Sequence, residues 1–255
     1  MRGINRIMLR RFPRLHNLIK KCYILYREIY FRLKRYLLGT RIEEKFWATR
    51  HLYKGDDWGN KDNEWVDGYW DSRNHKHRGF LIEEILRFSP SAIAEIGSNC
   101  GPNLYLLAKK LPSAKIVGVD INPVAVREGN KRFTQEGMSN VSLYLGRADK
   151  LERFQDKSFD VVFTDAVLIY IGPDKIGRVI NEMLRITRKA LILFEWHCFN
   201  SNPLGFYVGH WVRDYVALLK RFVPESKIRF IEMPDELWED KNWQKYGGII
   251  EVTIE

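Results

Sequence analysis

Five short apolar runs, each followed by a helical or turn segment, constrain the fold of this chain most. The runs are Ala92–Ile96, Lys115–Val119, Val141–Tyr144, Phe159–Phe163 and Ala190–Phe194. Short apolar runs that alternate with helical segments are typical of buried parallel strands joined by crossover connections. Because such crossovers are right-handed, the pattern predicts an α/β fold with a doubly wound, mostly parallel sheet.

The sequence on either side of these five runs indicates how the chain is organised. Two more strand-like runs, Lys227–Met233 and Gly248–Ile254, follow an amphipathic segment at Gly205–Arg221 and bring the expected sheet to seven strands. A periodic apolar stretch, His77–Arg87, predicts a helix before the first strand. We therefore expect one catalytic domain over residues 77–255.

Residues 41–76 precede that domain and have a different character. A short helix is expected at Arg41–Tyr53, and Lys54–Asn74 is rich in Gly, Asp, Asn and Trp, which indicates an ordered but irregular segment. We expect residues 41–76 to form a helical, aromatic lid. The aromatic residues of this lid and of the segment after the fifth strand are Trp47, Trp58, Trp65, Tyr69, Trp70, Trp196, Phe199, Tyr207 and Trp211.

Residues 1–40 form a basic, amphipathic N-terminal extension. Residues 1–41 contain 12 Lys and Arg but one acid, Glu28, whereas the rest of the chain has 30 basic and 31 acidic residues. The apolar residues recur at helical spacing, and the basic ones fall on the opposite side. The apolar set is Leu15, Leu18, Ile19, Cys22, Tyr26, Ile29, Tyr30, Leu33 and Leu37, and the basic set is Lys20, Lys21, Arg27, Arg32, Lys34 and Arg35.

Two interpretations of this helix remain open. Residues 14–37 suit the surface of an anionic membrane, and since charges interrupt every apolar run, the helix is expected to lie on a membrane and not to cross it. The alternative is packing on the protein's own body or on a second subunit, as in a homodimer. The three cysteines form no C-x-x-C pair, so we expect a cytoplasmic protein, peripheral on the inner face of the membrane in the first interpretation. A near-neutral body disfavours nucleic acid as a partner.

A glycine-containing loop follows the first predicted strand, at the sheet edge where such folds bind ligands. Gly97 and Gly101 allow a sharp turn and a close approach of the backbone, and Ser98 and Asn99 add small polar groups. Asn99 breaks the G-x-G-x-x-G fingerprint, which disfavours a nicotinamide dinucleotide. The second strand ends 23 residues after Gly97 at Asp120, whose carboxylate can accept hydrogen bonds from both hydroxyls of an adenosine ribose.

Four motifs resemble those of the class I S-adenosylmethionine-dependent methyltransferases, which have a Rossmann-like fold. Residues 94–101 are similar to their first motif and residues 119–120 to the second. Residues 146–149 are similar to a third motif, and residues 159–168 to the fourth. The resemblance covers roughly residues 77–255 and implies S-adenosyl-L-methionine as the cofactor. It also implies that Asp120 binds the ribose, Asp149 lies near the adenine edge, and the backbone around Gly97 and Asp165 holds the methionine part.

The residues expected to bind the cofactor are Glu95, Gly97, Ser98, Asn99, Gly101, Asn103, Asp120, Ile121, Ala148, Asp149, Asp165, Ala166, His77 and Arg78. The last two belong to a basic segment, residues 71–78. This segment suits either the cofactor carboxylate or an anionic acceptor, and is also typical of a solvated helix entry.

Transfer of a methyl group to a hydroxyl requires a base that removes the proton. His197, at the end of the fifth strand beside Glu195, is the first candidate, because an imidazole has a near-neutral pKa. His75 and His77 compete for this role, and Asp165 is a further candidate. The alternative for His197 is a hydrogen-bonded wall residue. Asp165 has no second acid at ligand spacing, so we expect no metal.

The acceptor is constrained less than the cofactor. Aromatic rings interleaved with Asp, Asn and Arg suit a sugar, and with the membrane-surface helix they lead us to expect O-methylation of a small molecule, a saccharide or a lipid-linked glycan. A packed lid over the cofactor is equally compatible with these rings. Two rival functions are N-methylation of a small molecule or protein, which the missing N-P-P-Y signature disfavours, and a non-catalytic cofactor-binding adaptor.

Overall fold

The structure is a computed structural model that describes residues 13–55, 59, 61–62, 64–200, 206–207 and 209–254. Trp58, the side chain of Tyr207 and residues 1–12 of the N-terminal extension lie outside this description.

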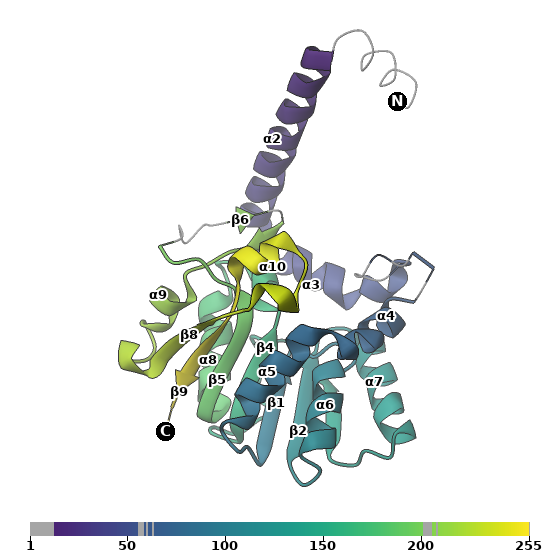
Figure 1. The fold of residues 1–255 in the computed structure, drawn as a ribbon, viewed down its shortest axis with the longest axis vertical. Helices are drawn as coiled ribbons and strands as arrows, with labels where there is room; N and C mark the ends of the chain where they lie inside the picture. Colours follow the sequence, from purple (N-terminus) through teal and green to yellow (C-terminus); the bar gives the residue numbers. More distant parts are fainter. Residues whose placement is uncertain are drawn as a thin grey trace.

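Seven strands form one sheet in the order β3-β2-β1-β4-β5-β9-β8 (Figure 1). The strands are β1 (Ala92–Ile96), β2 (Lys115–Asp120), β3 (Val141–Leu145), β4 (Phe159–Asp165), β5 (Thr187–Trp196), β8 (Ile228–Glu232) and β9 (Gly247–Thr253). The first five are parallel, and β9 pairs antiparallel with both β5 and β8. This confirms the doubly wound, mostly parallel, Rossmann-like sheet.

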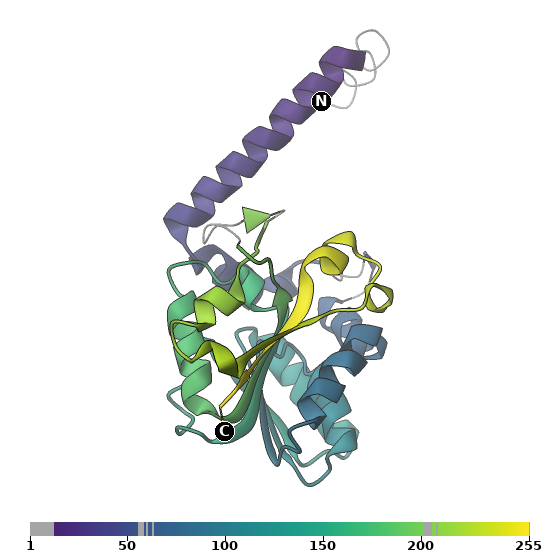
Figure 2. The ribbon, with the colours of Figure 1, turned by 60° about the vertical axis from the view of Figure 1, so that its left-hand side comes forward.

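Helices cover both faces of this sheet (Figure 2). On one face lie α5 (Lys76–Leu86), α6 (Pro102–Lys110) and α7 (Pro123–Gln135), and on the other α8 (Ile176–Ile186) and α9 (Tyr215–Leu219). Prolines at the first turns of α6 and α7 suit helix starts, where their missing N–H needs no partner. The Asn122 side chain caps α7 by accepting hydrogen bonds from the backbone N–H groups of Val124 and Ala125.

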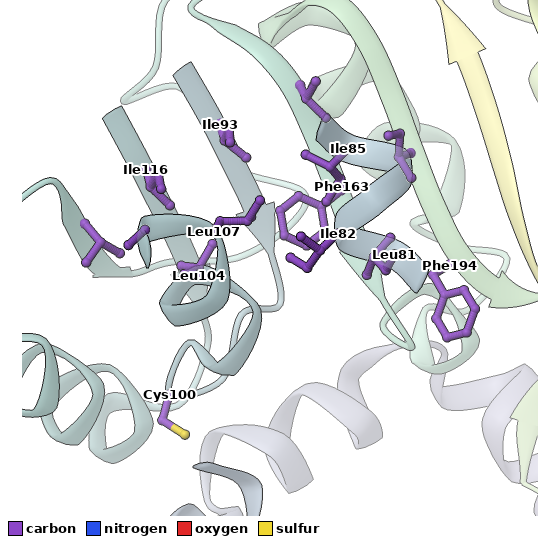
Figure 3. Close-up of a cluster of buried hydrophobic side chains, with 14 of the residues drawn as sticks. Leu81, Ile82, Ile85, Ile93, Cys100, Leu104, Leu107, Ile116, Phe163 and Phe194 are labelled. Atoms are coloured by element: carbon purple, nitrogen blue, oxygen red, sulfur yellow. The ribbon is translucent and has the colours of Figure 1, made fainter. Parts of the chain in front are cut away.

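Two hydrophobic cores, one on each face, fix the sheet edge that carries the site. The first joins α5 and α6 to the strands through fully buried side chains such as Leu81, Leu104 and Phe163 (Figure 3). The second packs α8 and α9 on the opposite face through residues such as Met183 and Tyr215. Every residue of β4 is buried, so Asp165 at its end is held by the core of the domain.

The segment of residues 41–76 is more regular than its sequence indicates. It contains α3 (Arg41–Ala48), the turns η1 (Arg50–Leu52) and η2 (Ser72–Asn74), and a helix, α4 (Trp65–Asp71), within the stretch expected to be irregular. Trp65 and Trp70 are buried against the first core. Burial of these large rings stabilises a helix that its glycine and aspartates disfavour.

The amphipathic segment Gly205–Arg221 is not one helix. Its described part forms a short hairpin, β6 (Phe206–Tyr207) with β7 (His210–Trp211), followed by the short helix α9. Gly209 turns the hairpin at a φ of +88°, a conformation that interrupts a helix. The chain after β8 continues through the turn η5 (Asp235–Leu237) and the helix α10 (Lys241–Tyr246). In Figure 1, α10 lies at the same end of the sheet as β6.

The N-terminal helix α2 (Pro13–Leu38) extends away from the domain in both views (Figures 1 and 2). It meets α3 at Gly39, which has a φ of +59°. In the part of the chain that the structure describes, no helix is both long and apolar enough to cross a bilayer.

Candidate active site

A cavity of about 420 Å³ opens at the carboxyl ends of the parallel strands, the edge at which doubly wound sheets bind ligands. Its volume is within the range of small-molecule sites. Loops after β1, β2, β3 and β4 line one part of the cavity, and aromatic residues from the hairpin and from the segment around α10 line another part. Residues of α3 and α4 also contribute to the lining. These parts form one continuous space.

The loop after β1 has the backbone that the glycine pattern indicates. Gly97 has a φ of +80°, and a Cβ atom there would lie 2.3 Å from Cγ2 of Val167. Its N–H and that of Ser98 donate to the carbonyl of Val119, at 2.7 and 3.1 Å, which ties the loop to β2. Asn99 also has a positive φ, of 51°. Gly97 and Asn99 both line the cavity.

Asp120 lines the cavity next to this loop, together with Ile121. Its two carboxylate oxygens accept backbone hydrogen bonds from Asn99 and Asn122, each at 2.7 Å. Burial raises the pKa of Asp120 to about 6, although those backbone donors favour the charged form. The carboxylate keeps lone pairs for further donors such as the hydroxyls of a ribose.

Asp149 lies in the cavity wall after β3, beside Ala148, and takes part in an ion-pair network with the lid. Arg147 contacts it at 3.0 Å, and Lys175 lies 3.6 Å away. Both cations also contact Glu44 of α3, at 2.8 and 2.6 Å. Burial alone would raise the pKa of Asp149, but Arg147 and Lys175 hold it below its usual value. The network fastens α3 over this end of the cavity.

Asp165 at the end of β4 is the centre of a buried polar cluster. Its Oδ2 atom receives hydrogen bonds from Arg78 at 2.8 Å and Asn103 at 2.9 Å, and Nε2 of His77 lies 3.2 Å away. Asn103 also donates to Glu95, at 2.7 Å. Burial alone would raise the pKa of Asp165, but His77 and Arg78 hold it well below its ordinary value. Asp165 is thus fixed as an anion under the cavity, next to Ala166, whose φ is +57°.

Eight of the residues expected to bind the cofactor line the cavity: Gly97, Asn99, Asp120, Ile121, Ala148, Asp149, Asp165 and Ala166. The other six, Glu95, Ser98, Gly101, Asn103, His77 and Arg78, lie behind this lining. Glu95, Asn103, His77 and Arg78 are members of the Asp165 cluster, and Ser98 is buried at 1% exposure. A Cβ atom on Gly101 would lie 2.6 Å from the ring of Phe133, so this glycine serves helix packing. Their position behind the lining indicates that these six residues hold the lining residues in place.

Glu195 lies outside the cavity lining, and its carboxylate is fully engaged. It accepts hydrogen bonds from the Thr164 hydroxyl at 2.8 Å and from the backbone of Val167, Leu168 and Ile169 at 3.0 to 3.2 Å. Burial raises its pKa to about 7. Because four donors already hold the carboxylate in the interior, the geometry argues against Glu195 as a base.

His197 is also outside the cavity lining. Its Nδ1 atom accepts a hydrogen bond from the backbone of Tyr215 at 3.2 Å, and its ring packs against Phe199 and Phe230. It is buried, and burial lowers its pKa. These contacts match the alternative of a hydrogen-bonded wall residue.

His75 is placed near the cluster but not in the cavity wall. Its ring contacts His77 and Trp238, with ring centroids 4.6 and 4.7 Å apart, and its Nδ1 atom lies 2.5 Å from Nδ1 of His77. Burial and the neighbouring His77 lower its pKa to about 4. It is therefore an internal partner of His77 at the start of α5.

The aromatic end of the cavity contains a histidine that the sequence did not single out. His210 of the β6–β7 hairpin lines the cavity, with Nε2 3.3 Å from the hydroxyl of Tyr170. Its ring also contacts Trp196, at a centroid distance of 4.8 Å. The only signal in the sequence was the aromatic setting of His210 between Tyr207 and Trp211.

Two stacked indoles complete this end. The rings of Trp238 and Trp243 are nearly parallel, with centroids 4.4 Å apart, and both residues line the cavity with Asp240 and Asn242. Trp47, Trp65 and Tyr69, from the segment of residues 41–76, also line the cavity. The backbone carbonyl of Trp47 accepts a hydrogen bond from Asn122, which fastens the lid next to Asp120. Such walls suit a ligand with an apolar face and a few polar edges.

Comparison of the sequence with known proteins finds methyltransferases. The methyltransferase domain family matches residues 93–190. Aklanonic acid methyltransferase of Streptomyces sp. strain C5 is 34% identical over 135 residues, which cover 52% of this chain and 60% of that protein. A protein of Mycobacterium ulcerans strain Agy99 that is named as an O-methyltransferase is 34% identical over 93 residues, which cover 34% of this chain and 42% of that protein. The chain thus spans about two to three fifths of the length of these relatives.

Solved structures share the fold at low sequence identity. Magnesium protoporphyrin IX methyltransferase of Synechocystis PCC 6803, with bound S-adenosylmethionine, matches with a TM-score of 0.58 and 13% identity, covering 85% of this chain and 97% of that one. Geranyl diphosphate C-methyltransferase of Streptomyces coelicolor A3(2) has a TM-score of 0.56 and 9% identity, covering 69% and 75%.

Proposed function

We propose that this chain, which belongs to the class I S-adenosylmethionine-dependent methyltransferases, transfers a methyl group to a hydroxyl oxygen of a small molecule. The observation that carries this proposal is the single cavity, which joins the loops after β1–β4 to an aromatic chamber with a histidine in its wall.

The first end of the cavity fits S-adenosyl-L-methionine. Asp120 presents a carboxylate for two ribose hydroxyls, and Gly97 keeps the wall free of a side chain. Ala148 and Asp149 suit the adenine end, and Ala166 beside Asp165 suits the methionine end. When bound, this cofactor supplies an electrophilic methyl carbon on a sulfonium, which an acceptor oxygen attacks as the carbon–sulfur bond breaks.

His210 is the proposed general base in place of His197. An imidazole in the chamber wall can take the proton of an acceptor hydroxyl as that oxygen attacks. Tyr170, at 3.3 Å, can hold the ring orientation through its hydroxyl. The indoles of Trp196, Trp238 and Trp243 then exclude water and hold the apolar face of the acceptor.

An acceptor with a flat apolar face and several hydroxyls meets these requirements. A sugar residue has this shape, and one attached to a lipid carrier would bring it to the membrane surface that the basic helix α2 suits. We therefore propose a saccharide, and specifically a lipid-linked glycan, as the acceptor class. Asp240 and Asn242 at the same end of the cavity supply polar edges for its remaining hydroxyls.

The test is methyl transfer from labelled S-adenosylmethionine to a panel of free saccharides, lipid-linked saccharides and small phenols. With the acceptor that reacts, His210→Asn is expected to lower kcat by about a hundredfold, the size of a general-base contribution, with the cofactor Kd unchanged. His197→Asn is the matched control and is expected to keep kcat within about twofold, as its ring lies outside the cavity. Loss of kcat in the control but not in His210→Asn would overturn the assignment.

N-methylation is a second candidate, and one observation favours it. Trp238, Trp243 and the carboxylate of Asp240 lie at one end of the cavity, a set of groups that also attracts a cationic amine. The backbone N–H groups of Asn242 and Trp243 already donate to that carboxylate, at 2.8 and 3.1 Å, which satisfies part of its hydrogen-bonding capacity. Amines in the same panel distinguish the two functions by which acceptors gain label.

A further inference from the structure

The described side chains of α2 are all exposed, and many of them are large and apolar. Leu18, Ile19, Tyr23, Leu25, Tyr26, Ile29, Tyr30, Leu33, Leu37 and Leu38 are between 47% and 77% exposed. Most of them fall on one side of the helix by their helical spacing. Contiguous apolar surface of this kind marks an interaction site, and the domain itself does not cover it.

Charge selects the kind of partner. The first 41 residues carry 12 Lys and Arg against one acid. Two copies of this segment packed together would bring like charges into contact, which disfavours a second copy of the chain as the partner. An anionic lipid surface offers the opposite charge and a hydrocarbon layer at the same depth as the apolar face.

The base of α2 is joined directly to the rim of the cavity. The backbone N–H of Thr40 donates to Asp174 at 3.0 Å, and its hydroxyl donates to the same carboxylate at 2.8 Å. That hydroxyl also accepts a hydrogen bond from the backbone N–H of Gly172, at 2.8 Å. A Cβ atom on Gly39 would lie 2.5 Å from the Asp174 carboxylate, so the chain passes this joint without a side chain.

Cavity-lining residues begin at this joint. Thr40, which directly follows Gly39, lies in the cavity lining. Glu43 and Glu44, in the first turn of α3, lie in the lining as well. A helix of 26 residues is about 39 Å long, so its whole length can lie on a surface while its end stays at the cavity.

From these features we propose that α2 docks, apolar face inward, on an anionic membrane leaflet and holds the cavity rim at that surface, so that the acceptor is drawn from the same leaflet. The docking itself rests on α2 alone, and the source of the acceptor rests on the proposed methyltransferase function.

Vesicle flotation of the full-length protein tests the docking. The protein is expected to float with vesicles of phosphatidylglycerol mixed with phosphatidylcholine, and to bind vesicles of phosphatidylcholine alone at least about tenfold more weakly. Raised salt is expected to weaken the first binding and not the second. Failure to float with the anionic vesicles, or equal binding to both kinds, would overturn the proposal.

Substitution of the exposed face assigns the binding to α2. The triple variant Leu18→Gln/Ile29→Gln/Leu33→Gln keeps good or moderate helix formers and is expected to bind at least about a hundredfold more weakly. The matched control is Leu52→Gln/Leu145→Gln, which removes two exposed leucines outside α2, at 70% and 56% exposure, and is expected to float like the original protein.

The remaining outcomes separate the interpretations. Full flotation of the triple variant would place the membrane contact elsewhere and overturn the proposal. A dimer in light scattering that the triple variant converts to a monomer, without flotation of either, would identify the face as a protein interface. S-adenosylhomocysteine binding by the same samples keeps the two proposals apart. Binding without flotation contradicts only the docking, and flotation without binding contradicts only the function.

Discussion

Removal of the Arg78 guanidinium is expected to destabilise the domain strongly. Arg78 is 2% exposed and makes four hydrogen bonds. Its Nη1 atom donates to Asp165 at 2.8 Å and to Asn103 at 2.9 Å, and two more bonds at 3.0 and 2.7 Å reach the carbonyl and hydroxyl of Ser72. Arg78→Met has a similar length but leaves the Asp165 carboxylate without the buried guanidinium that lies 2.8 Å from it.

The magnitude follows from this burial. Breaking a buried ion pair by removing one partner costs about 3–5 kcal/mol, because the other charge stays in the interior without compensation. For a domain of this size, each kcal/mol lowers Tm by about 2–4 °C, so a decrease of roughly 6–20 °C is expected. Arg78→Met/Asp165→Asn is expected to be more stable than Arg78→Met by at least about 1 kcal/mol, since it removes the stranded charge.

Urea unfolding followed by tryptophan fluorescence measures these free energies. The control is Arg73→Met, which breaks a pair with the exposed Asp71 and is expected to cost at most about 1 kcal/mol. A cost below about 1 kcal/mol for Arg78→Met, or a double variant less stable than the single one, would refute the role of this pair in holding Asp165.

Three further predictions concern the lining and its supports. Gly97→Ala is expected to weaken S-adenosylhomocysteine binding at least about tenfold in calorimetry, because its Cβ meets Val167 at a φ of +80°, whereas Gly177→Ala in α8 meets nothing within 4 Å and should leave it unchanged. The affinity for S-adenosylhomocysteine is also expected to fall as pH decreases through about 6, since the Asp120 carboxylate accepts hydrogen bonds from the ribose hydroxyls when it is deprotonated. An affinity that stays the same between pH 5 and pH 8 would count against this role. Glu195→Ala is expected to lower Tm by roughly 5–15 °C in differential scanning fluorimetry, because four buried donors lose their acceptor, and an unchanged Tm would contradict its structural role.

The fold was predictable because it depends on local patterns. The buried parallel strands appear as short apolar runs, and the crossover rule then fixes the sheet. The part of the cavity that includes Gly97 and Asp120 was predictable for a similar reason. Its residues follow strand ends directly, so their position is set by the sheet and not by distant contacts.

The residues at the other end of the cavity depend on contacts between distant segments. His210 reaches the cavity through a hairpin, and Trp238 and Trp243 reach it from the segment before the last strand. His197 occupies the expected strand end, yet its ring turns toward Phe199 and Phe230, which no local pattern encodes. Sequence position therefore indicated the correct edge of the sheet but not which side chains face the cavity.

His77 and Arg78 illustrate a subtler limit. Their charge and their place before the first strand indicated a ligand contact, and they do lie beside the cavity wall, bonded to Asp165. A basic residue can pair with a buried carboxylate of the protein as readily as with the carboxylate of a ligand, because the two groups are chemically the same. Only the burial of Arg78 and His77, at 2% and 1% exposure, distinguishes the two.

Titration of the full-length protein with S-adenosylhomocysteine tests the central claim most directly, because it asks whether the cavity at the ends of β1–β4 holds the cofactor. We expect one ligand per chain at pH 8, with Asp120→Asn at least about tenfold weaker and just as well folded by circular dichroism. A folded protein that binds no S-adenosylhomocysteine, or an Asp120→Asn variant that binds it as tightly as the original chain, would contradict the assignment.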